Sequence, residues 1–123
     1  MNARKYTSLT DTQAVAGAPP GWSVTDGALS AGYRTGSMIV GLDLVNQVVI
    51  AAEAGDHHPD VKLTCGAVTF TLMTHATGGL TTADVALAQT IAEFAAARGL
   101  VPEIRSGPDP LNSGSGPDSL RGE

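Results

Sequence analysis

Hydrophobic and polar positions alternate with two different periods along the chain, and the change of period separates predicted strands from predicted helices. Alternation with a period of two indicates four short strands, at residues 22–24, 29–33, 61–63 and 68–72. Apolar residues spaced three and four apart indicate helices over about 38–54 and about 81–98. A short first helix is also predicted after Thr10, which forms a capping-box pattern with Gln13.

Turn and cap residues lie between these segments and support the boundaries. Asp26-Gly27 and Gly66 suit the bends of two hairpins. Ser37 and Thr81 suit the N-caps of the two long helices, and Gly99 suits the end of the second. The predicted order is helix, hairpin, helix, hairpin, helix. This order is typical of an α+β two-layer sandwich, in which helices cover one face of a four-stranded antiparallel sheet.

Apolar residues that recur on one side of each element predict the hydrophobic core. Trp22 is expected in the core, and the strand residues Val68, Phe70 and Leu72 share one face. On the first long helix one broad apolar face is formed by Met38, Leu42, Val45, Val48, Val49 and Ala52. On the last helix the predicted buried stripe consists of Leu87, Ala88, Ile91, Ala92 and Ala95.

The chain divides into three predicted segments. Residues 1–20 form an N-terminal segment with the short helix, and residues 21–105 form one folded domain. Residues 106–123 consist mostly of Ser, Gly, Pro and Asp. Such a segment cannot bury enough apolar surface to offset the ordering of the chain, so a disordered tail is expected.

Composition limits the classes of function. The 123 residues carry a formal net charge of −5 and no basic stripe, which argues against a nucleic-acid partner. No uninterrupted apolar run reaches the roughly 18 residues needed to span a bilayer, and no signal peptide is evident. Cys65 is the only cysteine, so an internal disulfide is excluded, and we interpret it as a small packing residue. A cytoplasmic protein without a membrane partner is expected.

All three histidines fall within one short stretch, as His57, His58 and His75. Histidine is the side chain whose unperturbed pKa allows it to give and take protons near neutral pH. Pro59 stiffens the connector that carries the first two, and His75 is predicted at a strand end, off the core face. Two imidazoles placed around a substrate provide the groups that general acid–base catalysis requires. Carboxylates accompany them at Glu53, Asp56, Asp60 and Asp84.

These residues carry a family resemblance. Glu53-x-x-x-His57-His58-Pro59, the strand pair that follows, Thr74-His75, Gly79-Leu80-Thr81 and Asp84 closely resemble the pterin-4a-carbinolamine dehydratases. The resemblance extends from Gly21-Trp22 to about Ala97. It implies the family's reaction, in which a 4a-hydroxytetrahydropterin loses water to give a quinonoid dihydropterin.

The resemblance also implies roles for individual residues. His57, His58 and His75 correspond to the active-site histidines, and we expect His57 and His75 to transfer protons while His58 orients the pterin ring. The positions that line the pterin site correspond to Glu53, Asp56, Thr74 and Asp84. No metal and no organic cofactor is expected. The expected partners are the pterin and further copies of the chain, as a homodimer or homotetramer.

Two departures from the family pattern keep other functions open. The family usually has aromatic residues where this chain has Val61 and Cys65. One alternative is therefore a non-catalytic binding or assembly module, and another is a protein that holds a pterin without turnover. Individual residues also have simpler explanations. Asp84 can close a capping box with Thr81. Glu53 and Asp60 can be ordinary solvated carboxylates. The spacing of the histidines fits no common zinc motif.

Overall fold

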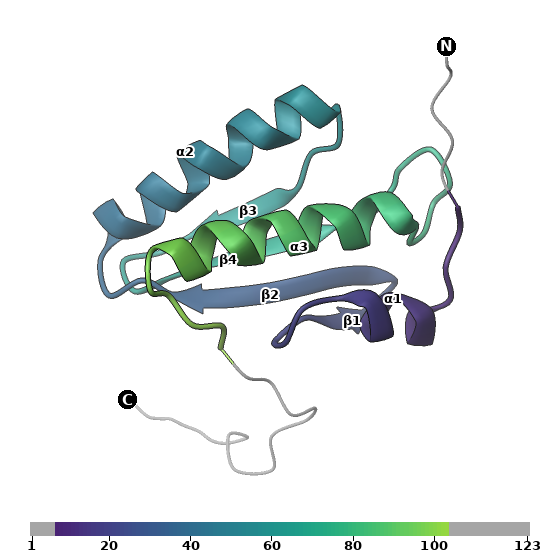
Figure 1. The fold of residues 1–123 in the computed structure, drawn as a ribbon, viewed down its shortest axis with the longest axis horizontal. Coiled ribbons are helices and arrows are strands. Elements are labelled where there is room, and N and C mark those ends of the chain that lie inside the picture. Colours follow the sequence, from purple (N-terminus) through teal and green to yellow (C-terminus); the bar gives the residue numbers. More distant parts are fainter. Residues whose placement is uncertain (1–6, 104–123) are drawn as a thin grey trace.

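The computed structural model describes residues 7–103 and has two layers, a sheet of four antiparallel strands with helices on one face (Figure 1). This confirms the predicted fold class and order of elements. The predicted tail, residues 106–123, lies outside the described residues. The elements are α1 (Asp11–Gly17), β1 (Ser23–Thr25), β2 (Ala28–Arg34), α2 (Met38–Gly55), β3 (Asp60–Leu63), β4 (Ala67–Leu72) and α3 (Thr82–Ala97).

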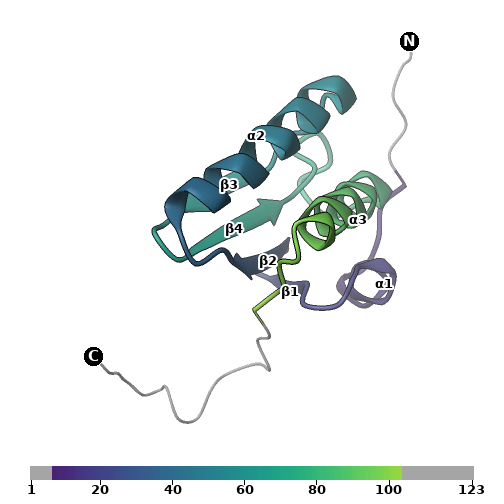
Figure 2. The ribbon, with the colours of Figure 1, turned by 60° about the vertical axis from the view of Figure 1, so that its left-hand side comes forward.

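The sheet has the order β1-β2-β4-β3, so β2 and β4 are central and β1 and β3 are the edges. The central pair places Ser30 opposite Thr71, and the edge strand β3 places Val61 opposite Phe70. Helix α2 contacts β3 and β4, whereas α3 contacts β2 and also α1, as Figure 2 shows. The C-terminal end of α2 and the N-terminal end of α3 therefore lie near the same end of the sheet.

The core lies between the sheet and the two long helices. Val68, Phe70 and Leu72 are completely buried, and Trp22 is buried, as predicted. The indole Nε1 of Trp22 donates a hydrogen bond of 2.9 Å to the Tyr33 hydroxyl, and Tyr33 packs edge-to-face against Phe70. The core residues predicted from the alternation in the strands and from the apolar stripe of α3 are therefore confirmed, except that Ala92 is only half-buried.

The helix caps follow the sequence signals. The side chains of Thr10 and Thr81 each close a capping box, with Gln13 and Asp84 as the third helical residues. The Ser37 hydroxyl accepts a hydrogen bond from the amide of Val40. Gly99 adopts a φ of 72°, a left-handed conformation that favours glycine after a helix. These caps account for the accuracy of the predicted helix starts.

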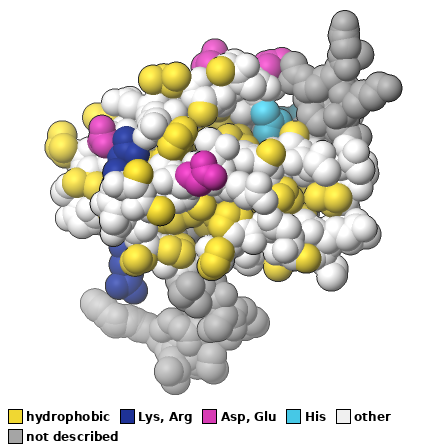
Figure 3. All heavy atoms as spheres, viewed as in Figure 1, with side chains coloured by type: hydrophobic (Ala, Val, Ile, Leu, Met, Phe, Trp, Pro, Cys, Tyr) yellow, Lys and Arg dark blue, Asp and Glu magenta, His cyan; other side chains and the backbone are white. Residues whose placement is uncertain are grey.

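Helix α2 differs from the prediction because half of its apolar face is turned away from the sheet. Its buried residues are Gly41, Leu44, Val48 and Ala52, while Met38, Leu42 and Val49 are exposed. Ile39 and Ile50 are 75% and 71% exposed. The apolar face is broader than the contact that one sheet can make with one helix. Figure 3 shows the resulting hydrophobic side chains spread over this helix.

Within residues 7–103, α2 is also the one helix long and apolar enough to cross a membrane by length and composition alone, although Asp43 and Glu53 interrupt its apolar residues. Only 22% of it is buried inside the chain. Asp43 and Gln47 on its flank accept hydrogen bonds from Arg98 at the end of α3, which fixes α2 beside α3. A helix attached in this way with an uncovered apolar face indicates a contact surface.

Candidate functional site

A tight turn at the end of α2 positions the first two histidines. Asp56 follows the helix with a φ of 52°, a left-handed conformation that aspartate tolerates better than most residues. The amide of His57 then donates to the carbonyl of Ala52, 3.1 Å away. The chain therefore reverses at Asp56, and Pro59 leads directly into β3. The predicted stiff connector has this physical basis.

A second turn, between Thr74 and Gly79, positions the third histidine. β4 ends at Leu72, before it reaches His75, and an isolated bridge joins Thr74 to Gly79. His75 lies in the turn that this bridge closes, and its side chain is exposed. His75 is therefore on a turn beyond the strand rather than at the strand end, although it does lie off the core as predicted.

The two turns meet around one hollow of about 240 Å³, and all three histidines line it. Residues distant in sequence are thereby gathered as the sequence suggested. Asp60, which has a simpler explanation as a solvated residue, also lines the hollow. Met73 and Ala76 were missed, and no sequence signal beyond their closeness to His75 would have found them. The lining residues are Asp56, His57, His58, Pro59, Asp60, Met73, Thr74, His75 and Ala76.

Asp84 holds His57 from behind this hollow. Nε2 of His57 lies 2.6 Å from Oδ1 of Asp84, whose side chain is completely buried. The second oxygen, Oδ2, accepts hydrogen bonds from the Thr74 hydroxyl at 2.8 Å and from the Thr81 amide at 2.9 Å. The Thr74 and Thr81 hydroxyls are themselves 2.7 Å apart. The carboxylate thus closes the helix cap and fixes the imidazole, and it does not line the hollow.

Glu53 pairs with the second histidine at the surface. Its Oε2 lies 2.7 Å from Nε2 of His58, and both side chains are largely exposed. Glu53 is not among the residues that line the hollow. An exposed pair of this kind adds little stability, so its effect is mainly to orient the His58 ring.

The departures from the family pattern lie outside the hollow. Val61 is exposed on the edge strand β3, and Cys65 is exposed at the bend before β4. The interpretation of Cys65 as a packing residue was therefore wrong.

Among the described side chains of residues 7–103, no group of three or more His, Cys, Asp or Glu residues has an arrangement that could hold a metal ion.

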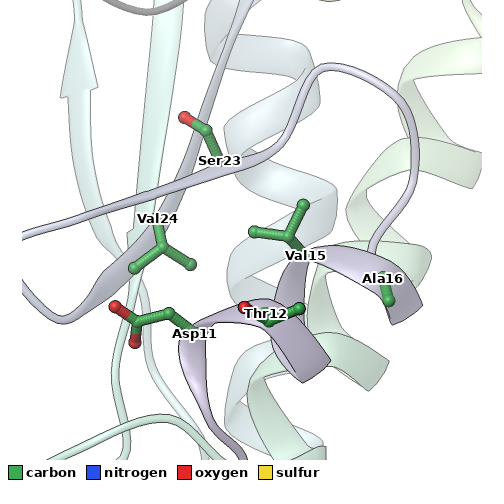
Figure 4. Close-up of a pocket in the computed structure, with 6 residues that line it drawn as sticks. All are labelled: Asp11, Thr12, Val15, Ala16, Ser23 and Val24. Carbon is green, nitrogen blue, oxygen red and sulfur yellow. The ribbon is translucent and has the colours of Figure 1, made fainter.

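A larger hollow, of about 560 Å³, lies elsewhere, between α1 and β1 (Figure 4). Asp11, Thr12 and Val15 line it from the helix, and Ser23 and Val24 line it from the strand. None of the predicted site residues reaches it. Among its lining residues Asp11 is the one titratable side chain, so they provide no pair of groups for proton transfer.

The sequence was compared with known families and proteins. The family described as Pterin 4 alpha carbinolamine dehydratase matches residues 5–94. A protein of Mycolicibacterium vanbaalenii is 44% identical over 85 residues, which cover 68% of this chain and 91% of that protein. A protein of Picosynechococcus is 43% identical over 86 residues, covering 68% and 94%. Both are provisionally named pterin-4-alpha-carbinolamine dehydratases.

The fold was compared with solved structures as well. The crystal structure of a transcriptional coactivator/pterin dehydratase from Brucella melitensis matches with a TM-score of 0.65. It is 26% identical in sequence, and the match covers 71% of this chain and 97% of that one.

Proposed function

The chain belongs to the pterin 4 alpha carbinolamine dehydratase family, and on this premise we propose that it eliminates water from a 4a-hydroxytetrahydropterin by histidine general acid–base catalysis. In this reaction the C4a–O bond breaks and the hydroxyl leaves as water after accepting a proton. The proton on N5 is lost, and the product is a quinonoid dihydropterin. The observation that carries the proposal is the hollow lined by His57, His58 and His75.

His57 and His75 are the proposed proton-transfer groups, because they enter the hollow from different turns. A substrate between them would meet one imidazole near the leaving hydroxyl and the other near N5. General acid–base catalysis by positioned imidazoles typically contributes about 10²–10⁴-fold to a rate. His58, held by Glu53 through the 2.7 Å contact, is the proposed orienting group.

Asp84 is the proposed positioning residue for His57. A carboxylate oxygen accepts, so the 2.6 Å contact places the proton of neutral His57 on Nε2 and its lone pair on Nδ1. The Thr74 hydroxyl and the Thr81 amide hold the carboxylate in place in turn. The prediction that Asp84 and Thr74 contact the pterin stays a prediction. Thr74 lines the hollow, whereas the burial of Asp84 behind it favours an action of Asp84 through His57.

The rim of the hollow suits the aminopyrimidine edge of a pterin. That edge presents adjacent N–H donors, and carboxylate oxygens are good acceptors for such donors. Asp56 and Asp60 both line the hollow, whereas Glu53 is engaged with His58 outside it. We therefore propose Asp56 and Asp60 as the groups that recognise this edge.

The test is a dehydration assay with the 4a-hydroxytetrahydropterin generated in situ. Formation of the quinonoid product is followed for the wild type, His57→Ala, His75→Ala and buffer alone. We expect the wild type to accelerate the reaction and each variant to lose about 10²-fold or more of the rate. Glu93→Ala, a change of an exposed residue on α3 outside the hollow, is the control.

Each other outcome has a definite meaning. No acceleration by the wild type over buffer would exclude the dehydratase. Equal rates for the wild type and both histidine variants would show that the proton-transfer groups had been misassigned.

We further propose that the chain self-associates through α2 and the edge strand β3. The sequence of α2 contains no basic residue, and its exposed residues include Ile39 and Ile50. Val61 is exposed on β3, which lies beneath α2 and is paired on one side within the chain. An antiparallel edge is complementary to a second copy of itself, so one contact can cover both surfaces. The exposed surface of α2 and β3 also supports the alternative function, a non-catalytic binding or assembly module.

A further inference from the structure

A second hollow also reaches His57, and it lies between α2 and α3. Its volume is about 250 Å³. His57 is the histidine that lines this hollow. We call it the α2–α3 hollow, defined by Ala51, Gly55, His57, Ala83, Ala86, Leu87 and Thr90.

The walls of the α2–α3 hollow are small and uncharged. Three alanines and Gly55 leave its space open, and besides His57 the only polar side chain among the lining residues is that of Thr90. An ammonium group would find no carboxylate among these residues, and an anion would find no Lys or Arg there. The hollow therefore suits a short apolar chain, with room for a hydroxyl near Thr90.

The size of the histidine-lined hollow indicates that a ligand extends beyond it. Sites for small molecules usually occupy about 300–1,000 Å³. The histidine-lined hollow has about 240 Å³, and the α2–α3 hollow adds about 250 Å³. His57 lines both hollows, so the two lie side by side at this residue, and a ligand bound next to His57 in one is adjacent to the other.

The chemistry of the substrate then decides which part enters the second hollow. In the proposed reaction His57 serves the 4a-hydroxyl or N5, and C6 is bonded directly to N5. The substituent on C6 is thus the non-reacting substituent closest to N5 along the bonds of the ring. The aminopyrimidine edge, which needs acceptors, lies at the other end of the ring and matches Asp56 and Asp60.

We propose that the α2–α3 hollow receives the uncharged substituent on C6 of the pterin and limits its length. This inference rests on the proposed function, because it takes the pterin and its orientation from the reaction. Ala86 makes the clearest probe, since it lines the hollow and is exposed, so a larger side chain there need not disturb the core.

The experiment measures binding and turnover with Ala86→Leu. Dissociation constants of the full chain are measured by calorimetry for two dihydropterins, one with a methyl group on C6 and one with a hydroxylated three-carbon chain. We expect Ala86→Leu to weaken binding of the longer ligand about tenfold and to leave the methyl ligand nearly unchanged. Ala96→Leu, an exposed position in the last turn of α3 away from the hollow, is the matched control. Circular dichroism and thermal unfolding verify that both variants fold.

The outcomes separate this inference from the proposed function. Equal weakening of both ligands, no weakening of either, or an equal effect of Ala96→Leu would overturn the subsite. Failure of the wild type to bind either ligand would overturn it too. If the wild type binds both ligands and dehydrates neither corresponding substrate, the dehydratase is excluded, while the pattern of dissociation constants still decides the subsite.

Discussion

Nε2 of His57 and Oδ1 of Asp84 lie 2.6 Å apart, although the residues are separated by 27 positions in the chain. One follows the last turn of α2 and the other belongs to the first turn of α3. The same carboxylate accepts from the Thr81 amide and so completes the start of α3. A single buried side chain therefore links the beginning of one helix to a histidine that follows another.

Asp84→Asn is expected to lower kcat about 10²-fold with little change in KM, because Asp84 is buried and acts through His57. The amide can still accept from Thr81, but it presents N–H groups as well and no longer favours the proton on Nε2 of His57. Nitrogen chemical shifts of the imidazole should report the changed tautomer. Glu93→Gln, which neutralises an exposed carboxylate on the same helix, is the control. A rise in KM without loss of kcat would instead indicate direct contact of Asp84 with the substrate.

Ile39→Glu combined with Ile50→Glu is expected to convert the protein to a monomer. Both side chains are more than two-thirds exposed in the single chain, and a charge there would be buried without a partner in a second copy. Light scattering after size-exclusion chromatography gives the mass. Ala96→Glu on α3 adds a charge away from this face as the control. A wild type that is already monomeric at high concentration would contradict the proposed interface.

Gly21→Ala is expected to destabilise the fold by about 2 kcal/mol more than Gly27→Ala. Both glycines have positive φ values, 91° and 76°, so both substitutions strain the backbone. At Gly21 the new Cβ would also lie 2.4 Å from Cβ of Pro102, whereas nothing lies within 4 Å at Gly27. Urea unfolding measures the difference between the two variants. Equal losses would show that the segment around Pro102 moves aside without cost.

Alkaline pH is expected to weaken the fold through Tyr33. Burial raises the pKa of Tyr33 above its ordinary value of about 10, and the hydrogen bond from Trp22 lowers that pKa by less. Above about pH 10 the unfolded chain therefore loses this proton while the folded chain keeps it, so the free energy of unfolding falls as the pH rises. Below about pH 10 Tyr33 is protonated in both the folded and the unfolded chain, so its full contribution to the free energy of unfolding is present.

Urea unfolding from about pH 9 to about pH 11 should show a steeper decline for the wild type than for Tyr33→Phe. The phenylalanine variant is expected to be less stable at neutral pH, because it leaves the buried Trp22 Nε1 without its acceptor. Parallel declines for the two proteins would assign the alkaline loss to other groups.

The elements were predictable because local signals agreed with the fold. Thr10, Ser37 and Thr81 cap the helices where expected, and the alternation of Val68, Phe70 and Leu72 identified the buried face of β4. The histidines were predictable as a group, since short connectors limit how far apart they can lie. The pairing of His57 with Asp84 was not, because it depends on where the first turn of α3 lies relative to the end of α2.

The burial of α2 could not be predicted for a different reason. Periodicity shows that Met38, Leu42 and Val49 share an apolar face, but it does not show whether the chain's own sheet covers that face. Similarly, Cys65 is small and close to a bend, and nothing local indicates that the bend turns it outward. Both errors concern which side chains are covered by other parts of the folded chain, and this depends on how the elements pack together rather than on the local sequence.

If His57 transfers protons as proposed, the shared carboxylate of Asp84 makes that catalysis depend on a local opening event. If the first turn of α3 frays, the Thr81 cap opens and the same motion releases His57 from its fixed orientation. Such local openings require less free energy than unfolding of the whole chain. Heating should therefore inactivate the protein at temperatures where its sheet and most of its core are still intact.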